Sequence, residues 1–307
     1  MVDAALLTLG FISLLTNSFL LGFIWSKANL RTLSTAILQS MLINGILWSI
    51  YSIARFAGQF NSYSVYLCVL LPRFGQGIFV NLNLHACFIM LERYISVAFP
   101  FRYEQLVTKK KIIIIIIASV WMLSLVIPIT AIISLNREGG ATNCTLIQVK
   151  SFVTVDASIH TCLLVVASLL LVILFLIYNR VICLIRMQEI RIVKSSTLEE
   201  ATQDSTVRII RKQKAVIQAV VVFTFYFTLL MPFLFASTLA FYDLTSRSRL
   251  KAASVTRYLA FSYPAIQPFI YAYYTANIRK ALVSAISKRK VEFNAINTIR
   301  SPNISTH

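Results

Sequence analysis

The sequence predicts an all-α membrane protein: a bundle of seven transmembrane helices with its N-terminus outside and a short amphipathic helix after the last span. Three observations predict this fold class. Hydrophobic residues make up 58% of the 307 residues and charged residues only 13%, whereas a soluble domain is nearer half apolar and a quarter charged. Seven apolar runs approach or exceed the roughly 20 residues that a spanning helix needs. Most of the 29 lysines and arginines fall between these runs.

The predicted spans follow one another with short connections, and the longest polar connection is 179–214. Backbone groups in lipid must be hydrogen-bonded within the protein, and runs such as IIIIII at 112–117 do not alternate, so the spans are predicted as helices rather than barrel strands. Apolar residues spaced by three and four predict the amphipathic helix at 275–290. We expect one seven-transmembrane domain, 1–290, and a cytoplasmic tail, 291–307. The predicted spans are 4–25, 34–57, 67–91, 112–134, 152–178, 215–241 and 254–274.

The net charge of +18 would favour a nucleic-acid partner in a soluble protein. Its placement argues against that interpretation. With the N-terminus outside, most lysines and arginines lie in the inner connections, as the positive-inside rule requires. They then face the anionic lipids of the inner leaflet. We therefore expect membrane lipids as partners and no nucleic acid.

No pattern of catalytic or metal-binding residues occurs in the chain. The histidines are His85, His160 and His307, and the HExxH, CxxC, GxSxG and phosphate-loop spacings are absent. We expect no enzyme, no catalytic residue, no metal site and no cofactor. The middles of the spans carry almost no charge, which disfavours a transporter or channel. A seven-helix transporter or channel remains a remote alternative.

Several motifs occur in order along the spans. The third run ends with LERYISVAFPFRY, and the seventh contains YPAIQPFIYAYYTANIRK. Asn17 lies in the first run, Trp121 in the fourth and Pro232 in the sixth. Together these motifs resemble the rhodopsin-like (class A) G-protein-coupled receptors over residues 4–290, and they are most similar to the fish-type odorant receptors of vertebrates.

This resemblance implies a multi-pass receptor of the plasma membrane that activates a heterotrimeric G protein. Arg93 would hold the third helix to the sixth at rest and face the G protein after the sixth helix swings out. The alternative is that Glu92 and Arg93 only cap the helix and reach toward the lipid headgroups. The implied switch residues are Glu92, Arg93, Tyr94, Tyr178, Pro232, Gln267, Pro268 and Tyr271.

The resemblance also implies a disulfide between Cys68, which lies 25 residues before Arg93, and Cys144 in the second outer loop. Asn143 begins Asn143-Cys144-Thr145, the sole sequon on the outer side and a candidate for glycosylation. The second span offers Asn44 or Gly45 where most of the family has a sodium-binding aspartate. Sodium modulation is therefore not expected.

The implied ligand pocket lies between the outer halves of the third, fifth, sixth and seventh spans. Gly75 stands where receptors for biogenic amines have an aspartate, so we expect no amine ligand. The pocket favours a small, mostly hydrophobic molecule, and Arg257 or Arg73 can pair with an anionic group. An odorant is the expected ligand, and an internal lipid or peptide is the alternative. The candidate pocket residues are Gly75, Gln76, Phe79, Val80, His160, Leu164, Phe233, Ser237, Arg257, Ala260 and Phe261.

Overall fold

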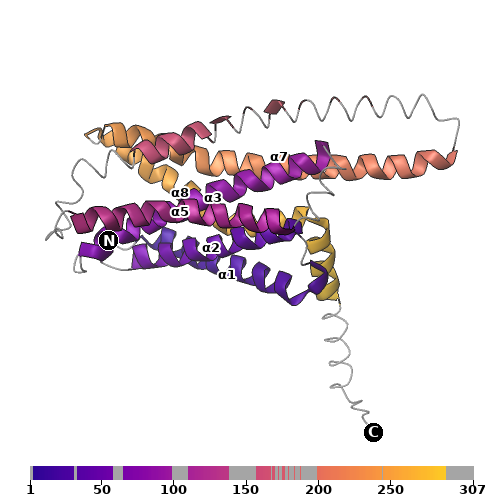
Figure 1. Cartoon of the computed structure of the whole chain (residues 1–307), viewed down its shortest axis with the longest axis horizontal. Helices are drawn as coiled ribbons and strands as arrows, with labels where there is room; N and C mark the ends of the chain where they lie inside the picture. Colours follow the sequence, from indigo (N-terminus) through magenta and orange to yellow (C-terminus); the bar gives the residue numbers. More distant parts are fainter. Residues whose placement is uncertain are drawn as a thin grey trace, which may run out of the picture.

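The computed structural model describes a set of long helices that pack side by side (Figure 1). The described residues are 3–30, 33–57, 65–98, 110–137, 157–166, eight scattered positions between 168 and 187, 199–243 and 245–287. Every regular element in these ranges is helical. They are α1 (Ala4–Ser26), η1 (Ala28–Leu30), α2 (Leu33–Ala57), α3 (Val65–Ala98), α5 (Lys110–Arg137), α7 (Glu199–Tyr242) and α8 (Arg247–Tyr274), with helix Ala157–Val166 between α5 and α7 and helix 276–287 after α8.

Three of the described helices are long and apolar enough to cross a membrane: Ala4–Ser26, Thr35–Phe56 within α2, and Val220–Tyr242 within α7. Shorter apolar helices occupy Ile114–Thr130 and Ala157–Val166. α3 and α8 are longer than a span requires but are less apolar. Both pack against several neighbours, α3 on α2, α5 and α7, and α8 on α1, α2 and α7. A helix surrounded by protein can carry polar side chains that a lipid-facing helix cannot.

Three helices extend well beyond the predicted spans: α3, α7 and α8, the last of which begins at Arg247 rather than at 254. α3 continues seven residues past the predicted end at 91, to Ala98, so Glu92, Arg93 and Tyr94 lie within its last turns rather than at its end. α7 begins at Glu199, which makes the second part of the predicted polar connection 179–214 helical.

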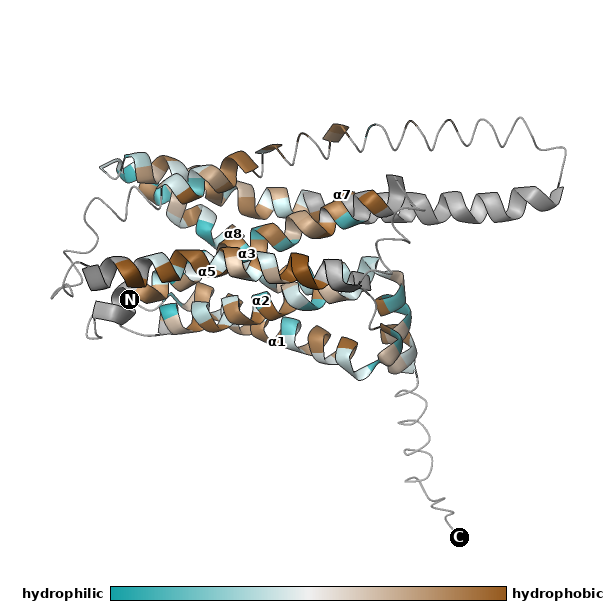
Figure 2. Ribbon diagram, viewed as in Figure 1, coloured by the Kyte–Doolittle hydropathy of each residue, from teal (hydrophilic) through white to brown (hydrophobic). Residues whose placement is uncertain are grey.

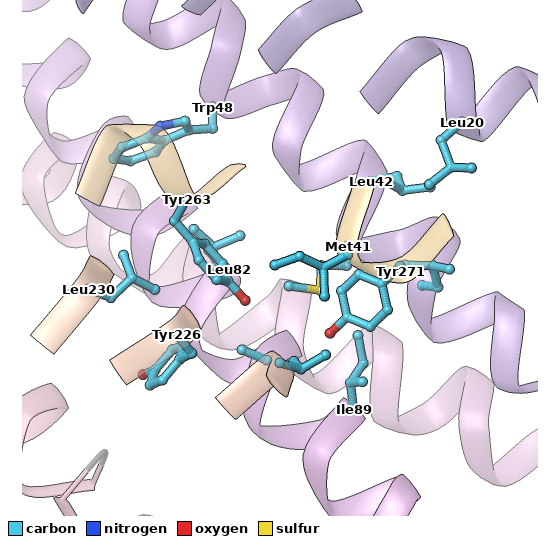
Figure 3. Packing of buried hydrophobic residues seen from close by; sticks show 14 of the residues in the cluster. Leu20, Met41, Leu42, Trp48, Leu82, Ile89, Tyr226, Leu230, Tyr263 and Tyr271 are labelled. Carbon is cyan, nitrogen blue, oxygen red and sulfur yellow. The ribbon is translucent and has the colours of Figure 1, made fainter. Parts of the chain in front are cut away.

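A large hydrophobic cluster in the described part of the protein is shared by α1, α2, α3, α7 and α8, and Ala236, Ala240 and Ala253 form a smaller one between α7 and α8. Figure 3 shows buried side chains of the large cluster reaching from Trp48 at one end of the view to Ile89 at the other, with Tyr263 and Tyr271 between them. Apolar side chains also cover the outside of the bundle. Leu15 and Phe19 of α1 are 70% and 66% exposed, as expected for a surface that meets lipid tails.

Hydrogen bonds at one end of the bundle join α1 to α8. Asp3 caps α1, because its Oδ1 accepts from the backbone N–H of Leu6 at 3.2 Å. Its Oδ2 accepts from the Tyr258 hydroxyl of α8 at 2.8 Å. α2 ends and α3 begins at this same end, which is the outer end of the predicted topology.

Helix 276–287 runs across the long axis of the bundle (Figure 1) and carries hydrophilic residues along much of its length (Figure 2). Ile278 is fully buried against the core. Ile286, two turns further along the same helix, is 68% exposed. Arg279 donates to the Tyr273 carbonyl oxygen at 3.2 Å and lies 5.8 Å from the centroid of the Tyr273 ring. These contacts fix the angle between this helix and α8.

Candidate functional site

An aromatic cluster lies in the half of the bundle where α2 ends, and we define it as the rings whose contacts follow. Trp48 of α2 lies 5.8 Å from Phe79 of α3 and 4.6 Å from Phe261 of α8, measured between ring centroids. Phe79 meets Phe233 of α7 edge to face at 5.7 Å. His160 lies 6.3 Å from Phe233 and 4.9 Å from Phe241. The remaining members are Tyr51, which packs on Trp48, and Phe56, which packs on Phe261.

The aromatic cluster brings together Phe79, His160, Phe233 and Phe261, which are four of the predicted pocket residues. The sequence reasoning missed the second helix, which supplies Trp48 at the centre of the cluster. The signal was present, because Trp48 and Tyr51 are spaced by three and must share a face of one helix. Phe241, two turns beyond Phe233 on α7, was also missed.

The other predicted pocket residues are placed less uniformly. Ala260 and Val80 are buried, and Leu164 packs against the core. The Ser237 hydroxyl donates to the Phe233 carbonyl oxygen of its own helix at 2.6 Å. The Gln76 amide oxygen accepts from Arg73 at 2.8 Å. The Ser237 hydroxyl and the Gln76 amide oxygen are therefore already hydrogen-bonded within the protein.

Gly75 is covered by the Tyr51 ring. A Cβ built on Gly75 would stand 2.2 Å from Cζ of Tyr51, far inside van der Waals contact. The position therefore requires glycine as long as the ring keeps its place. The space that a side chain at 75 would occupy belongs to a tyrosine of the neighbouring helix.

A polar contact between α1, α2 and α8 lies deeper in the bundle. Pro268 has no N–H, so the Pro264 carbonyl oxygen four residues earlier lacks its helical donor. The Asn17 amide donates to that oxygen at 2.9 Å and to the Ser13 carbonyl oxygen at 2.8 Å. Ser49 of α2 donates to the Ser13 hydroxyl at 2.8 Å. Asn17 thus completes the hydrogen bonding that the proline of α8 leaves open.

Gly45 occupies the position beside Asn17. A Cβ at 45 would stand 2.4 Å from the Asn17 Oδ1, and the neighbouring Asn44 instead donates to the Ile78 carbonyl oxygen of α3 at 3.2 Å. Both residues are uncharged, and the described residues contain no group of three His, Cys, Asp or Glu side chains that could hold a metal ion. The side chains at this place do not fit a sodium site built on a carboxylate.

A chain of hydrogen bonds joins α2, α3 and α5. The Trp121 indole N–H donates to Ser40 Oγ at 2.9 Å, and Ser40 Oγ lies 2.8 Å from His85 Nε2. His85 Nδ1 lies 2.9 Å from the Asn81 carbonyl oxygen, which can only accept. His85 therefore carries its proton on Nδ1, and Nε2 accepts from Ser40. Trp121 serves here as a donor that fixes the packing of three helices.

The predicted switch residues lie on α3, α7 and α8 as far as the structure describes them. Gln267 and Tyr271 of α8 are buried, at 1% and 2% exposure, and Pro232 and Pro268 lie inside α7 and α8. Glu92 is partly buried. Arg93 and Tyr94 belong to α3, but their side chains lie outside the described part of the protein. Tyr178, Cys144, Asn143 and the side chain of Cys68 lie outside it as well.

The arrangement of long packed helices, prolines in α7 and α8, and Asn17 bonded to the proline-containing helix agrees with the match to a known family. The family model described as 7 transmembrane receptor (rhodopsin family) matches residues 16–271. The chain belongs to the rhodopsin family of seven-transmembrane receptors. A search among curated proteins finds no match to this receptor.

The predicted disulfide of the receptor can be tested without knowing the ligand. We expect Cys68→Ser and Cys144→Ser each to abolish surface expression to the same degree, and the double variant to be no worse than either. Two residues that act only through one shared bond lose it completely with the first substitution. Surface labelling of the single and double variants measures this. Additive losses would show that the cysteines act separately.

Proposed function

We propose that this receptor is a chemosensory receptor of the odorant type, binds a small, mostly apolar molecule in the outer half of its bundle, and activates a heterotrimeric G protein at the plasma membrane. The observation that carries the proposal is the aromatic cluster. Rings from α2, α3, α7, α8 and helix Ala157–Val166 meet there. Aromatic surroundings with few polar groups favour a small hydrophobic ligand.

The proposed signal runs from this cluster toward the other end of α3. Phe79 and Glu92 are 13 positions apart on one helix, so their Cα atoms are separated by roughly 20 Å at 1.5 Å per residue. Phe233, which meets Phe79 edge to face, directly follows Pro232. Pro232 removes one hydrogen bond of α7 and makes that point a natural pivot. A ligand that changes the contact between Phe79 and Phe233 therefore acts beside the pivot of α7.

In this proposal Arg93 is the residue that contacts the G protein after α7 moves. A charged side chain in the partly dry last turns of a helix needs partners in both states, which makes it suited to a two-state switch. We expect Arg93→Ala to abolish odorant-stimulated cAMP in a reporter cell while surface expression persists. Arg247→Ala, an exposed arginine at the outer end of α8, is the matched control and keeps the response. Full signalling by Arg93→Ala would refute the switch.

A screen of odorants and metabolites in the same reporter cell separates the proposed function from its alternatives. An internal lipid or peptide as the active compound would replace the odorant class and keep the receptor function. A transporter or channel would instead give a ligand-driven current in cells without G protein. Persistence of such a current would refute signalling through a G protein.

A further inference from the structure

Four side chains with hydrogen-bond donors lie near the outer end of α2 and α8, and we call them the donor corner: Trp48, Tyr51, Arg55 and Arg257. Trp48, Tyr51 and Arg55 are spaced by three and four along α2 and share one face of it. Arg257 lies one turn before Phe261 on α8, and the Phe261 ring packs against Trp48 at 4.6 Å. Both guanidinium groups lie close enough to the Tyr51 hydroxyl to act on it electrostatically.

The donor corner is continuous with the aromatic cluster. Trp48 belongs to both, and its ring touches Phe79 and Phe261. Tyr51 lies over Gly75 of α3, one turn outward from Phe79. A molecule resting on the three rings of Trp48, Phe79 and Phe261 therefore has its outward end beside Tyr51, Arg55 and Arg257.

The donor corner offers donors and lacks fixed acceptors. Guanidinium groups only donate, an indole N–H only donates, and a phenol donates readily. The Trp48 indole N–H is buried and has no hydrogen-bond partner among the described residues. An unpaired buried donor costs free energy until an acceptor arrives.

Among the described residues, no carboxylate forms an ion pair with Arg55 or Arg257. Asp243, on the connection before α8, pairs with Arg249 at 3.4 Å. Asp3, at the same end of the bundle, accepts from Leu6 and Tyr258. Arg73 is engaged by Gln76, so it is the weaker of the two arginines that the sequence offered for an anion. Two like charges placed near one hydroxyl repel each other and favour a bound anion.

We propose that the donor corner binds the anionic group of an organic anion, such as a carboxylate, whose small apolar body rests on Trp48, Phe79 and Phe261. Arg257 and Arg55 supply the positive charge, and the hydroxyl of Tyr51 and the indole N–H of Trp48 complete the set of donors. This inference rests on the proposed function in one respect, that the ligand occupies the outer half of the bundle. The anionic group can come from a free carboxylate or from the headgroup of an anionic lipid, and the experiment distinguishes these sources.

The test measures binding without a G protein. Purified receptor in nanodiscs of zwitterionic phosphatidylcholine is heated with octanoate, decanoate and phenylacetate, and with the methyl ester and the primary alcohol of each. We expect at least one carboxylate to raise the Tm, with half-saturation at a concentration at least about tenfold lower than for its neutral counterparts, because hydrogen bonds to a charged group are stronger than those to a neutral one. Arg257→Gln removes this preference, and Arg257→Lys restores part of it.

The matched control is Arg247→Gln, which removes an exposed arginine from the same helix and keeps the preference. If Arg257→Gln does not fold, Arg55→Gln and Tyr51→Phe are measured in its place. Equal shifts by carboxylates and neutral counterparts, no shift by any probe, or a preference that survives the substitutions would each overturn the proposal.

A second arm replaces part of the phosphatidylcholine by phosphatidylglycerol, without a probe. A rise in Tm that Arg257→Gln removes identifies a lipid headgroup as the occupant of the donor corner and supports the site. Failure of the proposed function would give a different result. A receptor that binds carboxylates through Arg257 but gives no cAMP response would support the anion site and contradict the proposed signalling through a G protein.

Discussion

Gly77→Ala is expected to destabilise the receptor strongly, because α3 and α5 cross at this residue with no room for a side chain. A Cβ at 77 would stand 2.6 Å from the backbone carbonyl oxygen of Ser124 and 3.4 Å from Cδ of Pro128. The reason lies in α5. Pro128 has no N–H, so the Ser124 carbonyl, four residues earlier, has no helical donor, and it faces the Cα of Gly77 instead. A backbone atom cannot move aside as the end of a side chain can.

The expected cost of Gly77→Ala is about 1–3 kcal/mol, the usual range for overpacking a tight contact. Thermal unfolding of purified receptor in detergent measures it as a lower Tm. Gly22→Ala is the matched control, since a Cβ at 22 meets nothing within 4 Å. Alanine is the better helix former by roughly 0.8–1 kcal/mol, so Gly22→Ala should leave the Tm unchanged or raise it. Equal behaviour of the two variants would contradict the close contact of α3 with α5.

The helical class and the helix-interrupting prolines could be predicted from the sequence, because they follow from local properties of the chain. Apolar composition and run length are properties of the chain alone, and Pro268 must leave the Pro264 carbonyl without its helical donor. Which group then bonds to that oxygen depends on packing between helices that are distant in sequence. Asn17, 247 positions away, was identified through the family motif and not through its partner.

The parts of the site that the sequence could not predict are those made by contacts between helices. Nothing local shows that Tyr51 covers Gly75 or that Trp48 joins three aromatic rings, since both depend on how α2 faces α3 and α8. The helical start of α7 at Glu199 was missed for another reason. Serine, threonine and acidic residues at 195–206 are typical of loops, but they are also common in the first turns of a helix.

The lengths of the hydrophobic runs also did not show which helices face lipid and which lie at the centre of the bundle. α3 carries Asn81, Asn83 and His85, all nearly fully buried, and each of them makes a hydrogen bond to a neighbouring group. The average hydropathy of such a helix falls although it lies in the middle of the bundle. Polar residues in α3 therefore mark contacts with other helices rather than an end of the span.

One of these contacts leads to the second large effect: Tyr226→Phe is expected to raise signalling without ligand. The Tyr226 hydroxyl of α7 donates to Asn83 Oδ1 of α3 at 2.7 Å, and both side chains are buried, at 2% and 3% exposure. The Asn83 amide is held in place, since its Nδ2 donates to the Phe79 carbonyl oxygen at 2.7 Å. A swing of α7 away from α3 must break the bond between Tyr226 and Asn83.

Removing the Tyr226 hydroxyl destabilises the state in which α7 packs on α3. It does not change the free energy of the state in which α7 has moved away, because the bond is already broken there. A net value of about 0.5–1.5 kcal/mol for one hydrogen bond corresponds to a roughly two- to tenfold shift in the equilibrium between the two. We expect ligand-independent cAMP, normalised to surface expression, to rise within that range. Tyr242→Phe is the matched control on the same helix: its hydroxyl lies 3.3 Å from Thr161 Oγ1 at an exposed position, and its loss should change nothing. Unchanged or lower basal cAMP in Tyr226→Phe would show that this bond does not hold α7 in its resting place.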